Sequence, residues 1–138
     1  MSFGVEPAPV VIDASVAIEL LAGDERWVEH FDEWARADRI LLAPATFLPE
    51  VANGQLRGLR VPASDVVGRL ERLLATGVEA VDRGLHGLIE AVDLADQHGL
   101  TVYDALYLQL ALDIEGELAT LDNDLAAAAL AEGVALTP

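Results

Sequence analysis

The chain has 138 residues, 53% of them hydrophobic, and carries a net charge of −16. This length suits one domain with its own core, so we expect a single domain over residues 1–138, and the apolar content excludes global disorder. The absence of cysteine excludes disulfides, thiolate metal sites and cysteine nucleophiles. The apolar runs are too short to span a membrane and the first residues lack a secretory signal pattern, so a cytoplasmic protein is expected.

Strand-like and helix-like segments alternate along the chain. In chain order, the pattern predicts a strand at 9–13, helices at 14–22 and 24–38, a strand at 40–43, helices at 46–57 and 62–76, a strand at 78–81, helices at 84–98 and 102–114, a strand at 117–121, a helix at 123–132 and a final strand at 134–137. Strands separated by helices are typical of a parallel sheet covered on both faces. The sequence therefore predicts an α/β fold.

Four acidic residues occupy positions that such a sheet would bring together. Asp13 and Asp122 end strand-like runs, whereas Glu50 and Asp104 lie in the first turns of helices. Parallel sheets bind ligands beyond the carboxyl ends of their strands, where the strand order reverses, and these helices open at the same edge. Four carboxylates at one edge would form a site for a hard cation, which in turn indicates phosphodiester chemistry.

Each of these acids also has a purely structural interpretation. Asp13 and Asp122 could be N-caps of the helices that follow them, and Thr101 with Asp104 matches a capping-box pair. Glu50 lies on an apolar helical stripe, where a lone carboxylate is costly unless it is paired. The structural alternative for Glu50 is a buried salt bridge to an arginine.

The basic residues are few and unevenly distributed. All eight are arginines, and the acidic total argues against broad affinity for nucleic acids. Residues 51–75 nevertheless carry four arginines against two acids, a local net charge of +2. These four side chains could hold a phosphate backbone, or they could form i, i+3 pairs on a solvated helix. They are Arg57, Arg60, Arg69 and Arg72.

Four segments in this order resemble PIN-domain proteins, and specifically VapC-type toxins of toxin–antitoxin pairs. The segments are VVIDASVAIELL, APATFLPEVANGQL, LTVYDALYLQLA and LATLDNDLAAAA, which contain Asp13, Glu50, Asp104 and Asp122 respectively. They extend over almost the whole chain, and the string Tyr-Asp-Ala-Leu-Tyr-Leu at 103–108, followed by Thr-Leu-Asp at 120–122, is the most specific part.

The resemblance implies a three-layer α/β/α sandwich with a sheet of roughly five parallel strands. It also implies an acidic pocket that binds one or two Mg²⁺ or Mn²⁺ ions and cleaves RNA. By position, the four acids match the catalytic and metal-binding residues of the family, while Ser15 and Thr120 match small hydroxyl residues that orient carboxylates. Asp124 is either a further outer acid or a residue of the helix start. The family often has Arg or Lys after its fourth acid, whereas this chain has Asn123 and Asp124.

The sequence as a whole thus predicts a metal-dependent endoribonuclease, the toxin of a VapBC-type system, with a VapB-like antitoxin, an RNA substrate and a homodimeric state. Apolar stripes at 24–38 and 46–59 are candidate antitoxin contacts. The alternative is a catalytically silent acidic PIN-like interaction module with a structural metal site. A phosphoryl-accepting receiver is disfavoured because the chain lacks lysine. A haloacid-dehalogenase-type phosphatase is disfavoured because it needs Asp-x-Asp after the first strand, whereas Asp13 is followed by Ala14 and Ser15.

Overall fold

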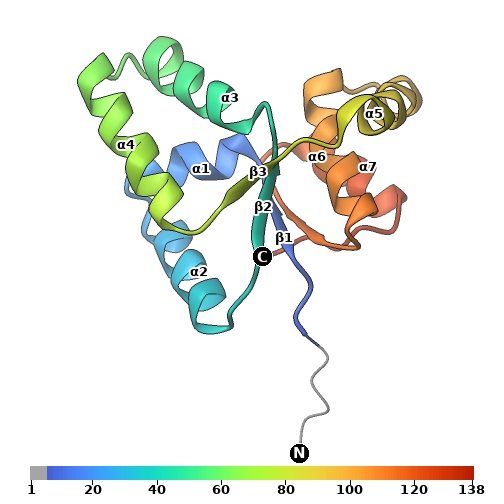
Figure 1. Ribbon diagram of the computed structural model, residues 1–138, viewed down its shortest axis with the longest axis horizontal. Helices are drawn as coiled ribbons and strands as arrows, with labels where there is room; N and C mark the ends of the chain where they lie inside the picture. The colour runs from blue at the N-terminus through green and yellow to red at the C-terminus, as the bar shows by residue number, and fades with distance from the viewer. Residues whose placement is uncertain (1–5) are drawn as a thin grey trace, which may run out of the picture.

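A parallel sheet of four short strands forms the centre of the structure, a computed structural model that describes residues 6–138 (Figure 1). The strands are β1 (Val10–Ile12), β2 (Leu41–Pro44), β3 (Glu79–Val81) and β4 (Glu117–Ala119), in the order β3-β2-β1-β4. Val11 of β1 pairs with Leu42 on one side and Leu118 on the other. The strand order therefore reverses between β1 and β4, which is where a parallel sheet opens a crevice at its carboxyl edge.

Helices cover both faces of the sheet, so the predicted three-layer α/β/α class is confirmed. One layer holds α1 (Ala14–Leu21), α2 (Glu25–Arg36), α3 (Phe47–Asn53), the π-helix η1 (Gly54–Gly58) and α4 (Ala63–Ala75). The other layer holds α5 (Gly84–His98), α6 (Val102–Asp113) and α7 (Asn123–Ala131) (Figure 1). None of these helices is long and apolar enough to cross a membrane, within the described part of the chain.

The expected fifth strand at 134–137 is present only as one bridge, between Leu118 and Leu136. Two backbone hydrogen bonds support it, from Leu118 N to Ala135 O at 2.9 Å and from Thr137 N to Leu118 O at 2.9 Å. The partner strand β4 is three residues long, and Pro138 has no N–H with which to extend the ladder. The sheet consequently has four strands rather than five.

Two helices show how the core is built. The stripe of α2 is buried, since Trp27, Phe31 and Trp34 are each 6–7% exposed. It packs in the core, and the prediction that it offers a surface to an antitoxin is wrong. Helix α6 is buried almost all round, as expected for a central helix of an α/β protein. Its first turn, with Asp104, therefore stands on a rigid element.

The predicted helix at 46–57 is formed by α3 and η1 together. The change to π-helical geometry begins at Gly54, where a Cβ would lie 2.5 Å from the Ile18 Cδ1 atom of α1. A larger residue at this position would require the Ile18 side chain to move, and π-helical turns are frequent near functional sites. The close contact fixes α3, and with it Glu50, over the carboxyl edge of β1.

Candidate metal centre

Asp13 lies directly after β1, at the crevice between β1 and β4, and is 5% exposed. Two hydroxyls donate to its Oδ2 atom, Thr120 Oγ1 at 2.6 Å and Ser15 Oγ at 2.9 Å. Asp13 does occupy the N-cap position of α1, as the structural interpretation expected, but its side chain makes no capping hydrogen bond there. Burial raises the pKa of Asp13, and the two hydroxyls oppose that rise because they stabilise the carboxylate.

The two hydroxyls also join the ends of β1 and β4. Thr120 Oγ1 accepts a hydrogen bond from Asp122 N at 3.0 Å, and Ser15 Oγ accepts one from Leu121 N at 3.1 Å. Each hydroxyl thus donates to Asp13 and accepts from the loop after β4. The loop is held beside Asp13, which brings Asp122 to the same crevice although β4 itself ends at Ala119.

Glu50 lies in the first turn of α3 and is half-buried. Its Oε1 atom is buried and has no hydrogen-bond partner among the described residues, and no arginine of residues 6–138 pairs with it. The salt-bridge interpretation is therefore wrong. Burial raises the pKa of Glu50, and the negative charges of Asp13 and Asp104 raise it further. These charges act on Glu50 because the three carboxylates face one region.

Asp104 and Asp122 complete the group from the other side of the crevice. Burial raises the pKa of Asp104, with further contributions from the charges of Asp122 and Asp13. Thr101 Oγ1 caps α6 by accepting from Asp104 N at 3.1 Å, whereas the reciprocal bond of a capping box is not found in the described part of the chain. The Asp104 carboxylate is accordingly left to face the other acids.

Asp122 serves as a cap and as a neighbour of the acidic group. Its Oδ1 accepts from Asp124 N at 2.9 Å and from Leu125 N at 3.0 Å at the start of α7, so the capping interpretation is correct. The same side chain adds to the charge that raises the pKa of Asp104. Asp124 is exposed and contributes least of these acids to Asp104. Capping fixes one oxygen of Asp122 and leaves Oδ2 for another partner.

Two further residues belong to the site and were not among the predicted site residues. Tyr107 is fully buried, its hydroxyl has no hydrogen-bond partner among the described residues, and burial followed by the charge of Glu50 raises its pKa. The Thr46 hydroxyl lies near enough to oppose the rise in the pKa of Glu50, yet it makes no hydrogen bond of ordinary geometry. The available signal was helical spacing, since Tyr107 follows Asp104 by three residues and Thr46 precedes Glu50 by four.

The acidic group has the chemistry of a hard-cation site. Within residues 6–138, no three Asp, Glu or His side chains are close enough to chelate an ion as they stand. The donors nevertheless suit Mg²⁺ or Mn²⁺, which take carboxylate oxygens, and the unpartnered Glu50 Oε1 is a buried acceptor that an ion would satisfy. The raised pKa values of Asp13, Glu50 and Asp104 indicate that their charges lack compensation.

The uncompensated charge predicts a pH-dependent effect of Glu50→Gln on metal-free protein. A raised pKa means that the folded state holds the proton more tightly, so ionised Glu50 costs stability as pH rises from the unfolded value of 4.5 through the folded pKa. We expect Glu50→Gln to melt close to wild type near pH 4. Towards pH 7.5, the free energy of unfolding of the variant should exceed that of wild type by about 1 kcal/mol after solvent screening.

Thermal melts in chelator across this pH range test the Glu50 effect. The control is Glu71→Gln, the same change at an exposed position, which should keep a constant difference from wild type. A loss of stability in Glu50→Gln that does not change with pH would contradict the expectation.

The four arginines of the basic segment lie apart from this network, on η1, the loop after it and α4. Arg57, Arg60 and Arg72 are exposed, and Arg69 donates to Gln55 Oε1 at 3.4 Å. None of the four forms an ion pair with any residue between 6 and 138. The interpretation as i, i+3 ion pairs on a solvated helix is therefore wrong, and four cationic groups remain free of acidic partners.

Comparison with known proteins agrees with this geometry. A family model described as PIN domain matches residues 10–130. Ribonuclease VapC3 of Pyrobaculum aerophilum is 56% identical over 39 residues, and this match spans 28% of the chain and 30% of that curated relative. The earlier resemblance to PIN-domain proteins and VapC toxins is thereby confirmed.

Two solved structures share the fold. VapC20 of Mycobacterium tuberculosis, a sarcin–ricin loop cleaving toxin, aligns with a TM-score of 0.69 at 20% identity, over 86% of this chain and 94% of that one. VapBC2 of Rickettsia felis, solved with a DNA fragment from its promoter, gives 0.70 at 13% identity, over 93% and 96%. At these identities the likeness establishes the fold alone.

Proposed function

Since the chain belongs to the PIN domain family, we propose that it is a Mg²⁺- or Mn²⁺-dependent endoribonuclease and the toxin of a VapBC-type pair. The observation that carries the proposal is the group of four carboxylates at the crevice between β1 and β4, in which the pKa values of Asp13, Glu50 and Asp104 are raised and one Glu50 oxygen is unpartnered among the described residues. The names of the relatives, a ribonuclease and a toxin that cleaves the sarcin–ricin loop, support the choice of RNA as substrate.

In this proposal, Asp13, Glu50, Asp104 and Asp122 hold the metal. A divalent ion there would neutralise the carboxylates, lower the pKa of a bound water and stabilise the leaving oxygen of the phosphodiester. Thr120 and Ser15 keep the Asp13 carboxylate in one orientation through Oδ2, which leaves Oδ1 directed to the site. Capping gives Asp122 the same single orientation.

Glu50 is the residue best placed to move a proton. Its raised pKa and its free oxygen are the properties of a general base that accepts a proton from the attacking water. Tyr107, held neutral beside it by burial, could donate a hydrogen bond to a negatively charged oxygen in the site. The chain therefore contributes orientation through the aspartates and proton transfer through Glu50.

The proposal is tested by the ends of the cleaved RNA. Purified protein, freed of any partner, is incubated with a broad RNA pool in Mg²⁺ or Mn²⁺ and in chelator. Attack by water on phosphorus leaves no 2′,3′-cyclic phosphate, which separates the expected reaction from contaminating ribonucleases that use the 2′-hydroxyl. Metal-dependent fragments with 5′-phosphate ends support the proposal, whereas cyclic ends or cleavage in chelator oppose it.

The free arginines are proposed to hold the RNA backbone. If Arg69 and Arg72 contact phosphates, replacing both with alanine should weaken RNA binding and reduce the slope of log K against log salt by about 0.7 per lost contact. Binding of a fluorescently labelled single-stranded RNA is measured from low to moderate salt. Chelator is present throughout to prevent metal-dependent cleavage. Arg26→Ala is the control, because this exposed arginine pairs with Asp24 on α2. An unchanged slope in the double variant would show that Arg69 and Arg72 do not contact RNA phosphates.

An antitoxin is proposed to occupy the apolar groove between α3 and α4. Pro49 and Leu56 line one wall and Val66 and Leu70 the other. Leu56, one of the exposed apolar residues of the predicted 46–59 stripe, lies in this groove. A VapB-like helix or extended segment placed there could insert a basic side chain between the acids. The solved toxin–antitoxin complex of Klebsiella pneumoniae, which has the same fold with a TM-score of 0.67, supports this type of partner.

A homodimer is proposed through the outer face of α5. Leu85, Leu88, Ile89 and Val92 form one stripe at helical spacing, and each is 42–71% exposed. We expect a particle of twice 14.7 kDa that Ile89→Arg converts to a monomer, because the new charge would be buried without a partner. Light scattering after size exclusion measures the mass. Leu130→Arg, at an isolated exposed leucine on α7, should remain dimeric. Equal masses for both variants would exclude this interface.

A further inference from the structure

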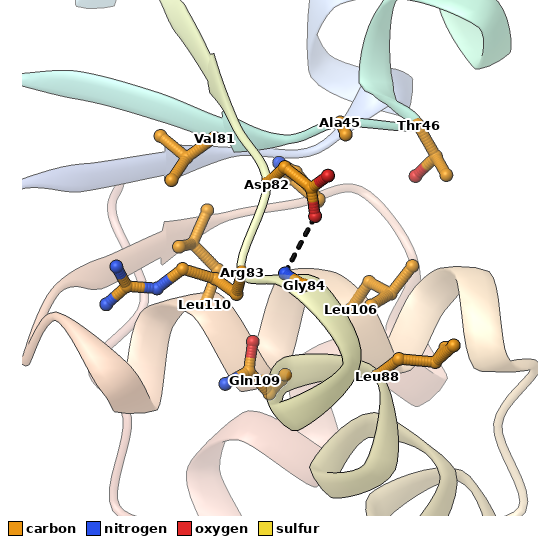
Figure 2. A pocket seen from close by; sticks show the side chains of 12 residues that line it. Ala45, Thr46, Val81, Asp82, Arg83, Gly84, Leu88, Leu106, Gln109 and Leu110 are labelled. Carbon is orange, nitrogen blue, oxygen red and sulfur yellow. Dashed lines mark hydrogen bonds between the residues drawn. The ribbon is translucent and has the colours of Figure 1, made fainter.

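A cavity of about 300 Å³ lies beside the acidic crevice, on the α5–α6 side of the sheet. It opens between the end of β2, the loop from β3 to α5, and residues 106–110 of α6. Figure 2 shows Asp82 of the loop on one side and Leu88, Leu106 and Gln109 on the other. Its walls are mostly apolar, and its volume is at the lower end for small-ligand sites. Among the residues of the site described above, Thr46 alone lines this cavity.

The cavity is in contact with the residues that carry the acids. Thr46, which lines it, is one helical turn before Glu50, and the backbone of Glu50 donates to Thr46 O at 3.0 Å. Leu106, which also lines it, lies between Asp104 and Tyr107 on α6. A group seated in the cavity would therefore be adjacent to any phosphodiester held at the four carboxylates.

One side chain of the cavity, Gln109, is suited to hydrogen-bond with a flat polar ligand. Gln109 is 1% exposed, yet its only hydrogen bond among the described residues is a long one, from Nε2 to Glu90 Oε2 at 3.5 Å. Gly87 holds the amide in place: a Cβ there would lie 3.2 Å from Gln109 Oε1, so α5 packs directly on the side chain. A primary amide donates and accepts side by side, the pattern that pairs with the edge of a nucleobase.

The mouth of the cavity fits the same ligand. Arg83 is fixed there by an ion pair with Asp113, and the Asp82 carboxylate accepts from Gly84 N at 2.8 Å. Held guanidinium groups stack on bases, and apolar walls such as Leu106 and Leu110 cover their faces. A base brings no negative charge of its own, so the overall charge of −16 does not oppose its entry.

We propose that this cavity is a subsite for one unpaired nucleobase of the RNA, next to the phosphodiester that is cut, and that Gln109 selects the base. The inference rests on the proposed ribonuclease function. It assigns sequence preference to the β3–α5 loop and α6, and leaves phosphate binding to the arginines on the opposite layer.

Titration with the four free ribonucleosides tests the subsite without any cleavage. Isotope-labelled protein in chelator is followed by NMR, with attention to the amides of residues 82–88 and 106–110. Nucleosides carry no phosphate, so their binding does not depend on the acids or the arginines. We expect one nucleoside to shift these amides most, and Gln109→Met, which keeps the side-chain length but removes the amide, to lower its affinity at least about fivefold. Gln97→Glu, at an exposed glutamine of α5, is the control and should bind as wild type.

The wild-type titration decides the matter even if Gln109→Met does not fold. No shift at these amides with any nucleoside, or shifts confined to other regions, would overturn the proposal. Shifts of the α6 amides 106–110 on dilution alone would also overturn it, because these residues lie outside the proposed α5 dimer face and the shifts would assign the cavity to a second copy of the chain. RNA cleavage that is metal-dependent but shows no base preference next to the cut would reject the subsite while leaving the nuclease intact.

Discussion

Replacing Asp13 with asparagine is expected to abolish RNA cleavage and to leave the fold unchanged. Asparagine has the same shape and can still accept from Thr120 and Ser15, so the link between β1 and β4 survives. It lacks the negative charge that a metal needs at the centre of the site. The rate should fall by more than the roughly 10- to 100-fold that is lost when a group that only orients a ligand is removed. Single-turnover cleavage measures the rate, and circular dichroism the fold.

The matched control is Asp96→Asn, the same change at an exposed position of α5 that forms no ion pair within residues 6–138. It should cleave as wild type. Asp104→Asn should behave as Asp13→Asn does, because it removes a charge from the opposite wall of the crevice. Full activity in either site variant would mean that the chemistry takes place elsewhere.

Divalent metal is expected to stabilise the wild-type protein strongly at neutral pH. Burial raises the pKa values of Asp13, Glu50 and Asp104, and the charges of neighbouring acids raise those of Glu50 and Asp104 further. Their ionised forms are therefore costly in the metal-free fold, and a bound cation relieves that cost. At a hundredfold excess over its Kd, a ligand adds about 2.7 kcal/mol. For a chain of this size, this corresponds to a rise in Tm of about 5–10 °C.

Differential scanning calorimetry with Mn²⁺ and with chelator measures the metal effect. The double variant Asp13→Asn, Asp104→Asn should show almost no rise, and Asp96→Asn a full one. Equal rises in all three proteins would place the metal outside the crevice. Stabilisation by metal without cleavage of any RNA would instead favour the alternative function, a silent acidic interaction module.

The acidic group was predicted from the positions of its members, two at the ends of strand-like runs and two in the first turns of helices, and from the motifs that resemble PIN-domain proteins. Asp13 and the loop holding Asp122 do meet, joined by Thr120 and Ser15. The number of strands was less predictable. The pattern at 134–137 is that of a strand, but whether it pairs over its length depends on β4, which is only three residues long.

Side-chain environment was the part that local patterns could not determine. The stripe of α2 and the stripe of α5 are both apolar at helical spacing, yet Trp27 is in the core and Ile89 faces solvent. Periodicity identifies a face of a helix and not the element that covers it. The same limit applies to Tyr107, which was not among the predicted site residues. Its unpartnered hydroxyl beside Glu50 depends on how α3 and α6 approach each other.

Removal and return of metal in one preparation tests the central claim most directly. Wild-type protein is treated with chelator, assayed on RNA, dialysed, supplied with increasing Mn²⁺ and assayed again, with Asp13→Asn treated identically. We predict that wild type loses cleavage in chelator and regains it with Mn²⁺, while Asp13→Asn stays inactive at every metal concentration. Cleavage by wild type that persists in chelator, or cleavage by Asp13→Asn that Mn²⁺ restores to the wild-type rate, would contradict a metal-dependent ribonuclease centred on these four acids.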